Sequence, residues 1–124
     1  MTNKRWKNKN FFEALNQSIK GIQYVLKNER NIRIQILFAI IAIIFGIIFK
    51  LSGTEFMILF FTIGLVIFAE IMNSAIEFVF DLYSEEYNEK IKIGKNIASG
   101  AVLSVAVISI IIGSILFIPK IILM

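Results

Sequence analysis

The sequence predicts an all-α integral membrane protein, because its composition, its three long apolar segments and one line of polar side chains all favour this class. The chain has 124 residues, of which 57% are hydrophobic, and its mean hydropathy is +0.78. Average protein sequences contain about 45–50% apolar residues. The chain is therefore expected to form one small domain, residues 1–124, that consists mainly of membrane-spanning helices rather than a soluble core.

The residue types that are missing limit the possible chemistry. The chain has no Cys and no His, which excludes disulfides, thiolate or imidazole metal sites and histidine-based triads. Carboxylates, amides, hydroxyls and cationic side chains remain, and these suit oxygen-ligated cations such as Mg²⁺ and anionic phosphates. The net charge of +4 could indicate nucleic acid, but the basic residues flank apolar segments. They therefore indicate membrane topology and lipid headgroup contacts, with no nucleic-acid partner.

Residues 1–33 are predicted to lie outside the bilayer. Residues 1–10 are polar and basic, with Trp6 as an expected interfacial anchor, and they lack the apolar core and cleavage site of a signal peptide. Residues 11–26 repeat apolar side chains at helical spacing, which predicts an amphipathic helix too polar to span. We expect this helix to lie on the membrane surface, and packing against a partner helix is a compatible alternative.

Three segments are predicted to cross the bilayer, at residues 34–53, 54–80 and 96–118. The second is longer than the hydrocarbon layer requires, so its last turns should emerge among the headgroups. The third begins with small residues, which allow close helix packing, and is expected to end at Pro119. Residues 81–95 are predicted to form the only substantial polar loop.

The distribution of Lys and Arg predicts the orientation. Eight of these residues precede the first span, one lies in the first turn, three lie in the polar loop and one lies in the tail. The positive-inside rule therefore places the amino terminus and the polar loop in the cytoplasm and the carboxyl terminus outside.

One polar stripe lies on the second predicted span, in the run AEIMNSAIEFVFD at residues 69–81. Its members recur at helical spacing and fall within roughly 100° of arc on one face. They are Glu70, Asn73, Ser74, Glu77 and Asp81. Ionisable groups within a membrane are costly, so they indicate a functional site by default. A structural polar contact between packed helices is the alternative interpretation.

The predicted topology brings several charged residues to the cytoplasmic face, with Glu70 somewhat deeper. Glu29 and Glu77 can hold a divalent cation whose other ligands are phosphate oxygens and water. Lys95 is placed at the amino end of the last helix, where the helix dipole and free N–H groups favour anions. Partial desolvation would suit Glu70 to take a proton from a hydroxyl at the interface. These features predict phosphate transfer from a metal-bound nucleotide to a lipid hydroxyl.

The motif ExxNSAIExxxD, followed by Glu86-Tyr87 and then Lys95, closely resembles the prokaryotic diacylglycerol kinase and undecaprenol kinase family. Similar segments extend the resemblance over nearly the whole chain. They are Ser18 to Gly21 and Ile22, Asn28-Glu29, Arg33 and Ala101 to Leu103. The Glu-Arg-Asn run at 29–31 and the ending IGSILFIPKI favour the Gram-positive branch, whose members prefer undecaprenol.

The resemblance implies an ATP- and Mg²⁺-dependent lipid kinase in the bacterial inner membrane, a multi-pass homotrimer with sites shared between neighbouring chains. The implied substrate is undecaprenol, with diacylglycerol as the alternative. The implied general base is Glu70, and the implied metal ligands are Glu29 and Glu77. The implied nucleotide-binding residues are Gln17, Glu29, Glu77, Glu86, Tyr87, Asn88, Lys95 and Asn96. The implied lipid contacts are Arg33, Glu70 and Ser99.

Three positions depart from the family pattern. Asn96 stands where the family usually has Asp, and Asn88 and Gln35 stand where His is frequent. The lost charge at Asn96 predicts reduced turnover, whereas the other two changes are expected to be tolerated. The competing class is a non-enzymatic small membrane transporter or pore protein. That class explains three spans and one intramembrane acid, but not the convergence of Glu29 and Lys95 on Glu77.

Overall fold

The computed structural model describes residues 7–123, which form four α-helices. The helices are α1 (Phe11–Asn28), α2 (Arg30–Ile48), α3 (Gly53–Tyr83) and α4 (Glu89–Ile122). The last three are each long and apolar enough to cross a membrane. The prediction of an all-helical protein with three candidate spans is therefore confirmed. Trp6, the expected interfacial anchor, lies outside the described residues, as do Lys4 and Arg5, two of the eight basic residues that precede the first span.

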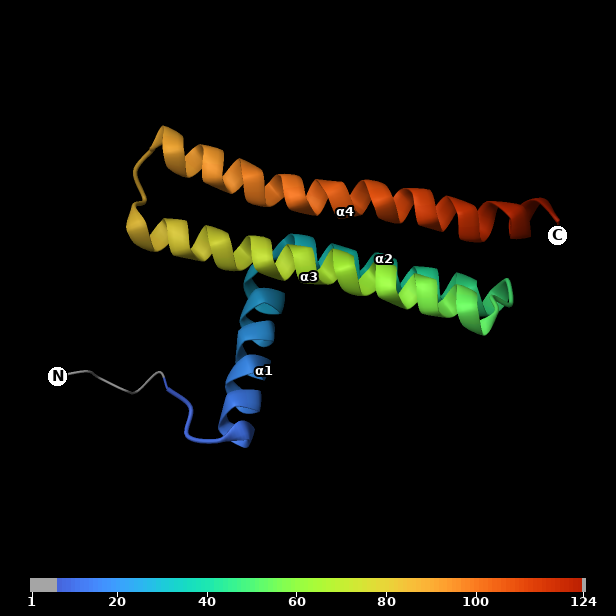
Figure 1. Ribbon diagram of the computed structural model, residues 1–124, viewed down its shortest axis with the longest axis horizontal. Coiled ribbons are helices and arrows are strands. Elements are labelled where there is room, and N and C mark those ends of the chain that lie inside the picture. Colours follow the sequence, from blue (N-terminus) through green and yellow to red (C-terminus); the bar gives the residue numbers. More distant parts are fainter. Residues whose placement is uncertain (1–6, 124) are drawn as a thin grey trace.

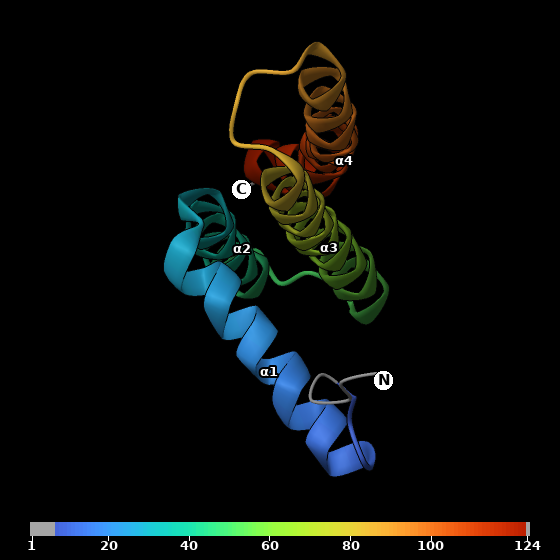
Figure 2. The ribbon, with the colours of Figure 1, turned by 90° about the vertical axis from the view of Figure 1, so that its left-hand side faces the viewer.

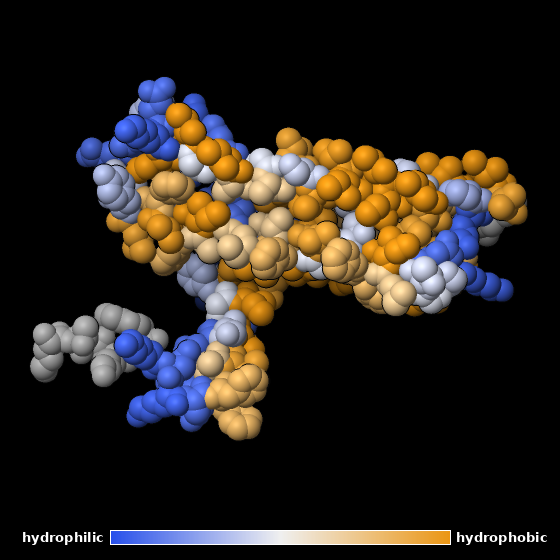
Figure 3. Space-filling model, in the orientation of Figure 1, coloured by the Kyte–Doolittle hydropathy of each residue, from blue (hydrophilic) through white to orange (hydrophobic). Residues whose placement is uncertain are grey.

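The three long helices run side by side, and α3 lies between α2 and α4 (Figures 1 and 2). The helix α1 leaves this bundle and runs across the direction of the long helices (Figure 1). Hydrophobic residues cover the length of the bundle, and hydrophilic residues gather at the end that holds the α3–α4 connection (Figure 3). This distribution is typical of a membrane protein whose apolar side chains face lipid.

The corner between α1 and α2 consists of a single residue, Glu29, with extended backbone angles (φ −113°, ψ 115°). The other end of α1 is capped by Asn10, whose side chain accepts a hydrogen bond from the Glu13 N–H at 2.9 Å. Arg33 Nη1 donates to two carbonyls of the last turn of α1, at 2.9 and 2.8 Å. Arg33 therefore satisfies carbonyls that the helix leaves unpaired and fixes the corner that carries Glu29.

A tight turn reverses the chain between α2 and α3. Lys50 adopts a left-handed conformation (φ 57°), and the N–H groups of Lys50 and Leu51 bond to carbonyls of the last turn of α2. This is the pattern in which a helix end is closed by one left-handed residue. Ser52 then begins α3 in a capping box with Glu55.

Ion pairs join α3 and α4 at both ends. Lys95 Nζ lies 2.6 Å from Asp81 Oδ1 at the connecting loop, and Lys120 Nζ lies 3.1 Å from Glu55 Oε1 at the far end. Near that far end, a buried apolar cluster also brings α2 into contact; its members are Leu51, Leu59 and Leu116. Polar contacts therefore join α3 and α4 at both ends of the hairpin.

The predicted loop 81–95 is wrong in extent, because only residues 84–88 are non-helical. The side chain of Asn88 accepts hydrogen bonds from two N–H groups of the next turn, so α4 begins at Glu89. The helix of the last predicted span also continues past residue 118, to Ile122. Pro119 lies in the last turns of α4, where its missing N–H removes one hydrogen bond without ending the helix.

Gly94 allows α4 to approach α3 at the ring of Phe80. A Cβ atom built on Gly94 would overlap the Phe80 ring, whereas one built on Gly64 would meet nothing within 4 Å. We expect Gly94→Ala to lower the free energy of unfolding by about 1–3 kcal/mol, because the ring must move. Gly64→Ala is the matched control and should be neutral or stabilising. Thermal unfolding in detergent measures both, and an unchanged Gly94→Ala protein would contradict this packing.

Candidate active site

The polar stripe on α3 passes from the interior of the bundle to the surface. Glu70 and Ser74 are buried, with 3% and 7% of their surface exposed, whereas the Asp81 side chain is 60% exposed. Between them, Asn73 Nδ2 donates to Glu77 Oε1 at 3.3 Å. The stripe therefore connects one buried carboxylate with acids near the α3–α4 loop, as its sequence spacing predicted.

Glu70 is held by a residue from another helix. Gln35 Nε2, on α2, donates to Glu70 Oε2 at 3.2 Å. Among the described residues, three buried side-chain atoms on or beside the stripe have no hydrogen-bond partner: Gln35 Oε1, Asn73 Oδ1 and Ser74 Oγ. Buried polar atoms normally have a hydrogen-bond partner. An unpaired one is often a place where a ligand, an ion or water binds.

A groove between α1 and α3 brings three acidic residues together. This carboxylate groove has a volume of about 640 Å³ and is lined by Glu29, Glu77 and Asp81 together with apolar residues such as Ile22 and Phe78. Glu29 reaches it from the α1–α2 corner, and the other two come from α3. The α1–α2 corner and α3, which are far apart in the sequence, therefore supply the predicted metal ligands to one groove.

The donor set of the carboxylate groove suits a hard cation that is only partly ligated by protein. Within residues 7–123, no three acidic side chains come close enough together to hold a metal ion by themselves. Mg²⁺ is commonly bound by one or two carboxylates, with phosphate oxygens and water as the other ligands. The chemistry of Glu29 and Glu77 therefore fits a metal that arrives with a nucleotide.

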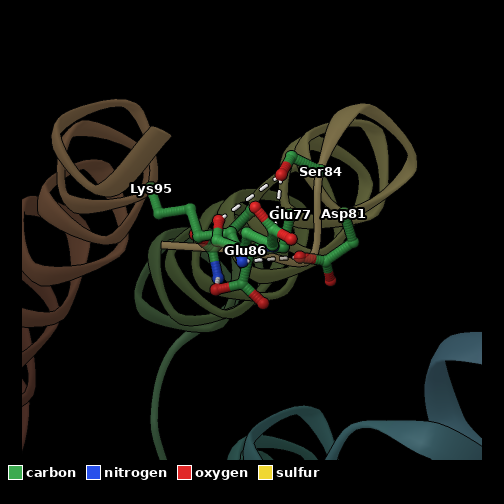
Figure 4. Close-up of polar contacts among 6 residues, drawn as sticks. Glu77, Asp81, Ser84, Glu86 and Lys95 are labelled. Carbon is green, nitrogen blue, oxygen red and sulfur yellow. Dashed lines mark hydrogen bonds and ion pairs between the residues drawn. The ribbon is translucent and has the colours of Figure 1, made fainter. Parts of the chain in front are cut away.

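A second groove, the loop groove, lies at the α3–α4 connection and has a volume of about 420 Å³. It brings together five of the residues expected to contact a nucleotide: Glu86, Tyr87, Asn88, Lys95 and Asn96. Asp81 lines both grooves, which makes them neighbours. Figure 4 shows Glu77, Asp81, Glu86 and Lys95 at this end of the hairpin, with the Asp81–Lys95 ion pair drawn as a dashed line.

The predicted position of Lys95 at the start of the last helix is wrong. Because α4 begins at Glu89, Lys95 lies more than one turn inside it, beyond the free N–H groups of the first turn. The helix dipole acts within the first turn and adds little there. Asn96 cannot reach those amides either, and Asn88 accepts hydrogen bonds from two of them. Any interaction of Lys95 with an anion would therefore depend on its own charge, and its ammonium group pairs with Asp81.

Five predicted site residues line neither groove. Glu70 and Asn73 lie on the polar stripe of α3, and three others lie away from it. Arg33, expected at the lipid, caps the end of α1. Gln17 on α1 and Ser99 on α4 are exposed and line neither groove. The structure thus brings together the acids, Lys95 and the loop residues, and it places these three elsewhere on the chain.

Two contacts were not foreseen from the sequence. From the sequence, Gln35 stands out only as a departure from the family pattern. A polar residue inside an apolar span is, however, itself an indication of a functional site. The Glu55–Lys120 ion pair joins residues more than sixty positions apart, and no local pattern predicts it.

The fold and the site together define a small integral membrane protein with a buried carboxylate on a helix that also lines two neighbouring grooves, one lined by acids and the other by both acids and lysines. Residues 16–117 match the prokaryotic diacylglycerol kinase family, and the chain belongs to that family. The prediction of a lipid kinase is confirmed at this level. Membership implies ATP and a lipid as substrates, and it does not favour the alternative of a transporter or pore protein.

Two relatives are similar over most of the chain. The undecaprenol kinase of Bacillus subtilis is 37% identical over 110 residues, which cover 89% of each protein. A diacylglycerol kinase of a Synechocystis species is 34% identical over 100 residues, which cover 80% of this chain and 57% of that protein.

Proposed function

We propose that this protein is an ATP- and Mg²⁺-dependent undecaprenol kinase, which converts undecaprenol to undecaprenyl phosphate. The observation that carries the proposal is the burial of Glu70 one helical turn before Ser74, which lines the carboxylate groove, on a helix long enough to span. The greater coverage of the undecaprenol kinase relative favours this lipid. Diacylglycerol is the second candidate, because a shorter match to a diacylglycerol kinase favours it.

In the proposed reaction, Glu70 takes the proton of the lipid hydroxyl as the lipid oxygen attacks the γ-phosphorus of ATP. The new oxygen–phosphorus bond forms while the bond to the bridging oxygen breaks, and ADP leaves with that oxygen. A buried carboxylate near an apolar region suits this role, because a lipid alcohol is presented from the bilayer. The proton then passes from Glu70 to water.

The residues above Glu70 are proposed to bind the nucleotide. Glu29 and Glu77 would hold Mg²⁺, which when bound neutralises charge on the transferring phosphates. Lys95 would add positive charge beside those phosphates, and the loop groove would receive the rest of the nucleotide. Asp81 orients Lys95 through their 2.6 Å contact, so it is proposed as a supporting residue.

The remaining assigned residues are proposed to act at the edges of the site. Gln17 and Ser99 are exposed, and each is proposed to meet the nucleotide or the lipid in the assembled protein. Arg33 is proposed to contact the lipid while it caps α1. Asn73 and Ser74 are proposed to support the stripe between Glu70 and Glu77, since each carries a buried polar atom that is available for a further hydrogen bond.

We further propose that α1 lies on the cytoplasmic surface of the bacterial inner membrane. It lies across the direction of the long helices (Figure 1), and Figure 3 shows hydrophobic residues along one of its edges and hydrophilic residues along the other. Its large apolar side chains are exposed: Phe11, Phe12, Leu15, Ile19 and Ile22. The positive-inside rule then puts the carboxyl terminus outside.

A homotrimer with sites shared between neighbouring chains is also proposed. The start of the third span offers a surface of small residues, because Ser99 and Ala101 are exposed and a Cβ on Gly100 would meet nothing within 4 Å. Small residues let membrane helices approach closely. A neighbouring chain on this surface would also cover Ser99 and bring it into contact with a site.

Asn96 provides a test of charge in the loop groove. Asn96→Asp introduces the carboxylate that the family usually has at this position, in the groove that Lys95 also lines. We expect this change to raise kcat by about tenfold or more. A tenfold change corresponds to about 1.4 kcal/mol of activation barrier. The effect is expected because a charged acceptor contributes more than an amide to positioning cations and donors. Steady-state kinetics at saturating MgATP and lipid measure it. Equal kcat values for the two proteins would show that the charge is dispensable.

Competition between the two lipids tests the substrate assignment. Purified protein in detergent with MgATP receives undecaprenol and diacylglycerol together, and the two phosphorylated products are separated and counted. We expect undecaprenol to have the larger kcat/KM. A larger value for diacylglycerol would move the assignment to the second candidate.

A further inference from the structure

Gln35 differs from Thr62 and Ser109, the other two polar residues of a cavity between the three long helices. The cavity is small, with a volume of about 170 Å³. Those two hydroxyls each bond to a carbonyl of their own helix, at 2.7 Å. Gln35 instead reaches across to α3 and donates to Glu70.

A side chain that reaches a buried carboxylate from another helix limits how that carboxylate can move. The Nε2–Oε2 distance is 3.2 Å, Glu70 is 3% exposed, and Gln35 is half-buried. Glu29 and Glu77 bring further negative charge to the same end of the site. A donor that remains fixed on Glu70 offsets their repulsion and holds the carboxylate in one orientation.

The amide also has an acceptor that no other group uses. Gln35 Oε1 is buried and accepts no hydrogen bond. An ionised carboxylate only accepts hydrogen bonds, whereas a protonated one also donates. The side-chain amide of Gln35 carries a donor, Nε2, and an acceptor, Oε1. A half-turn about its last torsion exchanges the two atoms, so the group that faces Glu70 changes from a donor to an acceptor. Because Oε1 has no hydrogen-bond partner, the half-turn would break only the bond from Nε2 to Glu70, and a bond from the protonated Glu70 to Oε1 would replace it.

We infer that Gln35 is a positioning residue for Glu70, donating to the ionised carboxylate before phosphate transfer and accepting from the protonated carboxyl afterwards. The inference rests on the proposed role of Glu70 as the base. In this role Gln35 touches neither the nucleotide nor the phosphate. Its loss should therefore slow the chemical step and leave the binding of MgATP unchanged.

The test compares three variants of the full-length protein in undecaprenol-containing detergent micelles. Gln35→Leu removes both polar atoms at similar volume, Gln35→His keeps one donor and one acceptor on a planar group, and Ser109→Ala removes a polar group from the same cavity. We expect Gln35→Leu to lower kcat by about 10–100-fold, the loss typical when a partner that orients a functional group is removed. The KM for MgATP should stay within about twofold.

The other two variants separate positioning from packing. Gln35→His should recover most of the lost kcat, and Ser109→Ala should keep the original kcat within about twofold. If Gln35→Leu does not fold, Gln35→Asn replaces it, because the same amide on a chain shorter by one methylene no longer reaches Glu70. Thermal unfolding in the same detergent checks each protein.

Three results would overturn the inference. They are an unchanged kcat in Gln35→Leu or Gln35→Asn, an equal loss in Ser109→Ala, and a loss in Gln35→Leu that appears in the KM for MgATP and not in kcat. The first result, with the original protein active and Glu70→Gln inactive, would leave the proposed function standing. An original protein that phosphorylates neither undecaprenol nor diacylglycerol would contradict the proposed function itself.

Discussion

Glu70→Gln is expected to lower kcat for lipid phosphorylation by about 10²–10⁴-fold, which is the usual cost of removing a general base. This loss corresponds to about 3–5 kcal/mol of activation barrier. Gln has almost the same shape as Glu, and its carbonyl oxygen can still accept the hydrogen bond that Gln35 donates at 3.2 Å. The substitution therefore removes the base while it preserves the contact between α2 and α3.

The matched control for this experiment is Glu55→Gln. Glu55 lies on the same helix at its opposite end, where it pairs with Lys120 at 3.1 Å and lines neither groove. Its replacement should leave kcat within about twofold, because Glu55 and Lys120 lie at the opposite end of the hairpin from the site residues. Binding of MgATP, measured by calorimetry, should be normal in both variants. Loss of MgATP binding in Glu70→Gln would instead make Glu70 a metal ligand.

Glu77→Gln is expected to abolish turnover by weakening the metal-bound nucleotide. Glu77 lines the carboxylate groove with Glu29, and the described residues supply no cluster of three acids that would compensate for its loss. We expect the Mg²⁺ concentration that gives half-maximal rate to rise by about tenfold or more, because one of two protein ligands loses its charge.

Two measurements make the Glu77 result specific. Thermal unfolding without nucleotide should be almost unchanged, since the hydrogen bond from Asn73 at 3.3 Å can also form to an amide oxygen. A titration with Mg²⁺ at fixed ATP then gives the metal dependence. A Glu77→Gln protein with normal Mg²⁺ dependence would exclude Glu77 from the metal site.

The polar stripe and the three spans could be predicted because both depend on local periodicity. The spacing of Glu70, Glu77 and Asp81 fixes their common helix face, and the structure places them along one side of α3. The start of α4 could not be placed, because it depends on whether one Asn side chain turns back to cap a helix. Residues 89–95 mix charged side chains with two isoleucines and a glycine, and such a run suits a loop and a helix outside the hydrocarbon equally well.

The partners of the site residues depend on tertiary contacts, and so the sequence did not predict them. Gln35 meets Glu70 only because α2 and α3 pack antiparallel after a tight turn. Arg33 has the charge expected of a headgroup contact, but the one-residue corner at Glu29 brings it to the end of α1. Such roles follow from the angle between helices, which local spacing does not determine.

The most direct test of the central claim is transfer of labelled phosphate from γ-labelled ATP to lipid by the purified protein in vesicles that contain undecaprenol. The account predicts Mg²⁺-dependent label in the organic phase, as undecaprenyl phosphate, from the original protein, and a signal lower by about 10²–10⁴-fold from Glu70→Gln. Equal label from the two proteins, or label that enters only the aqueous phase, would contradict it.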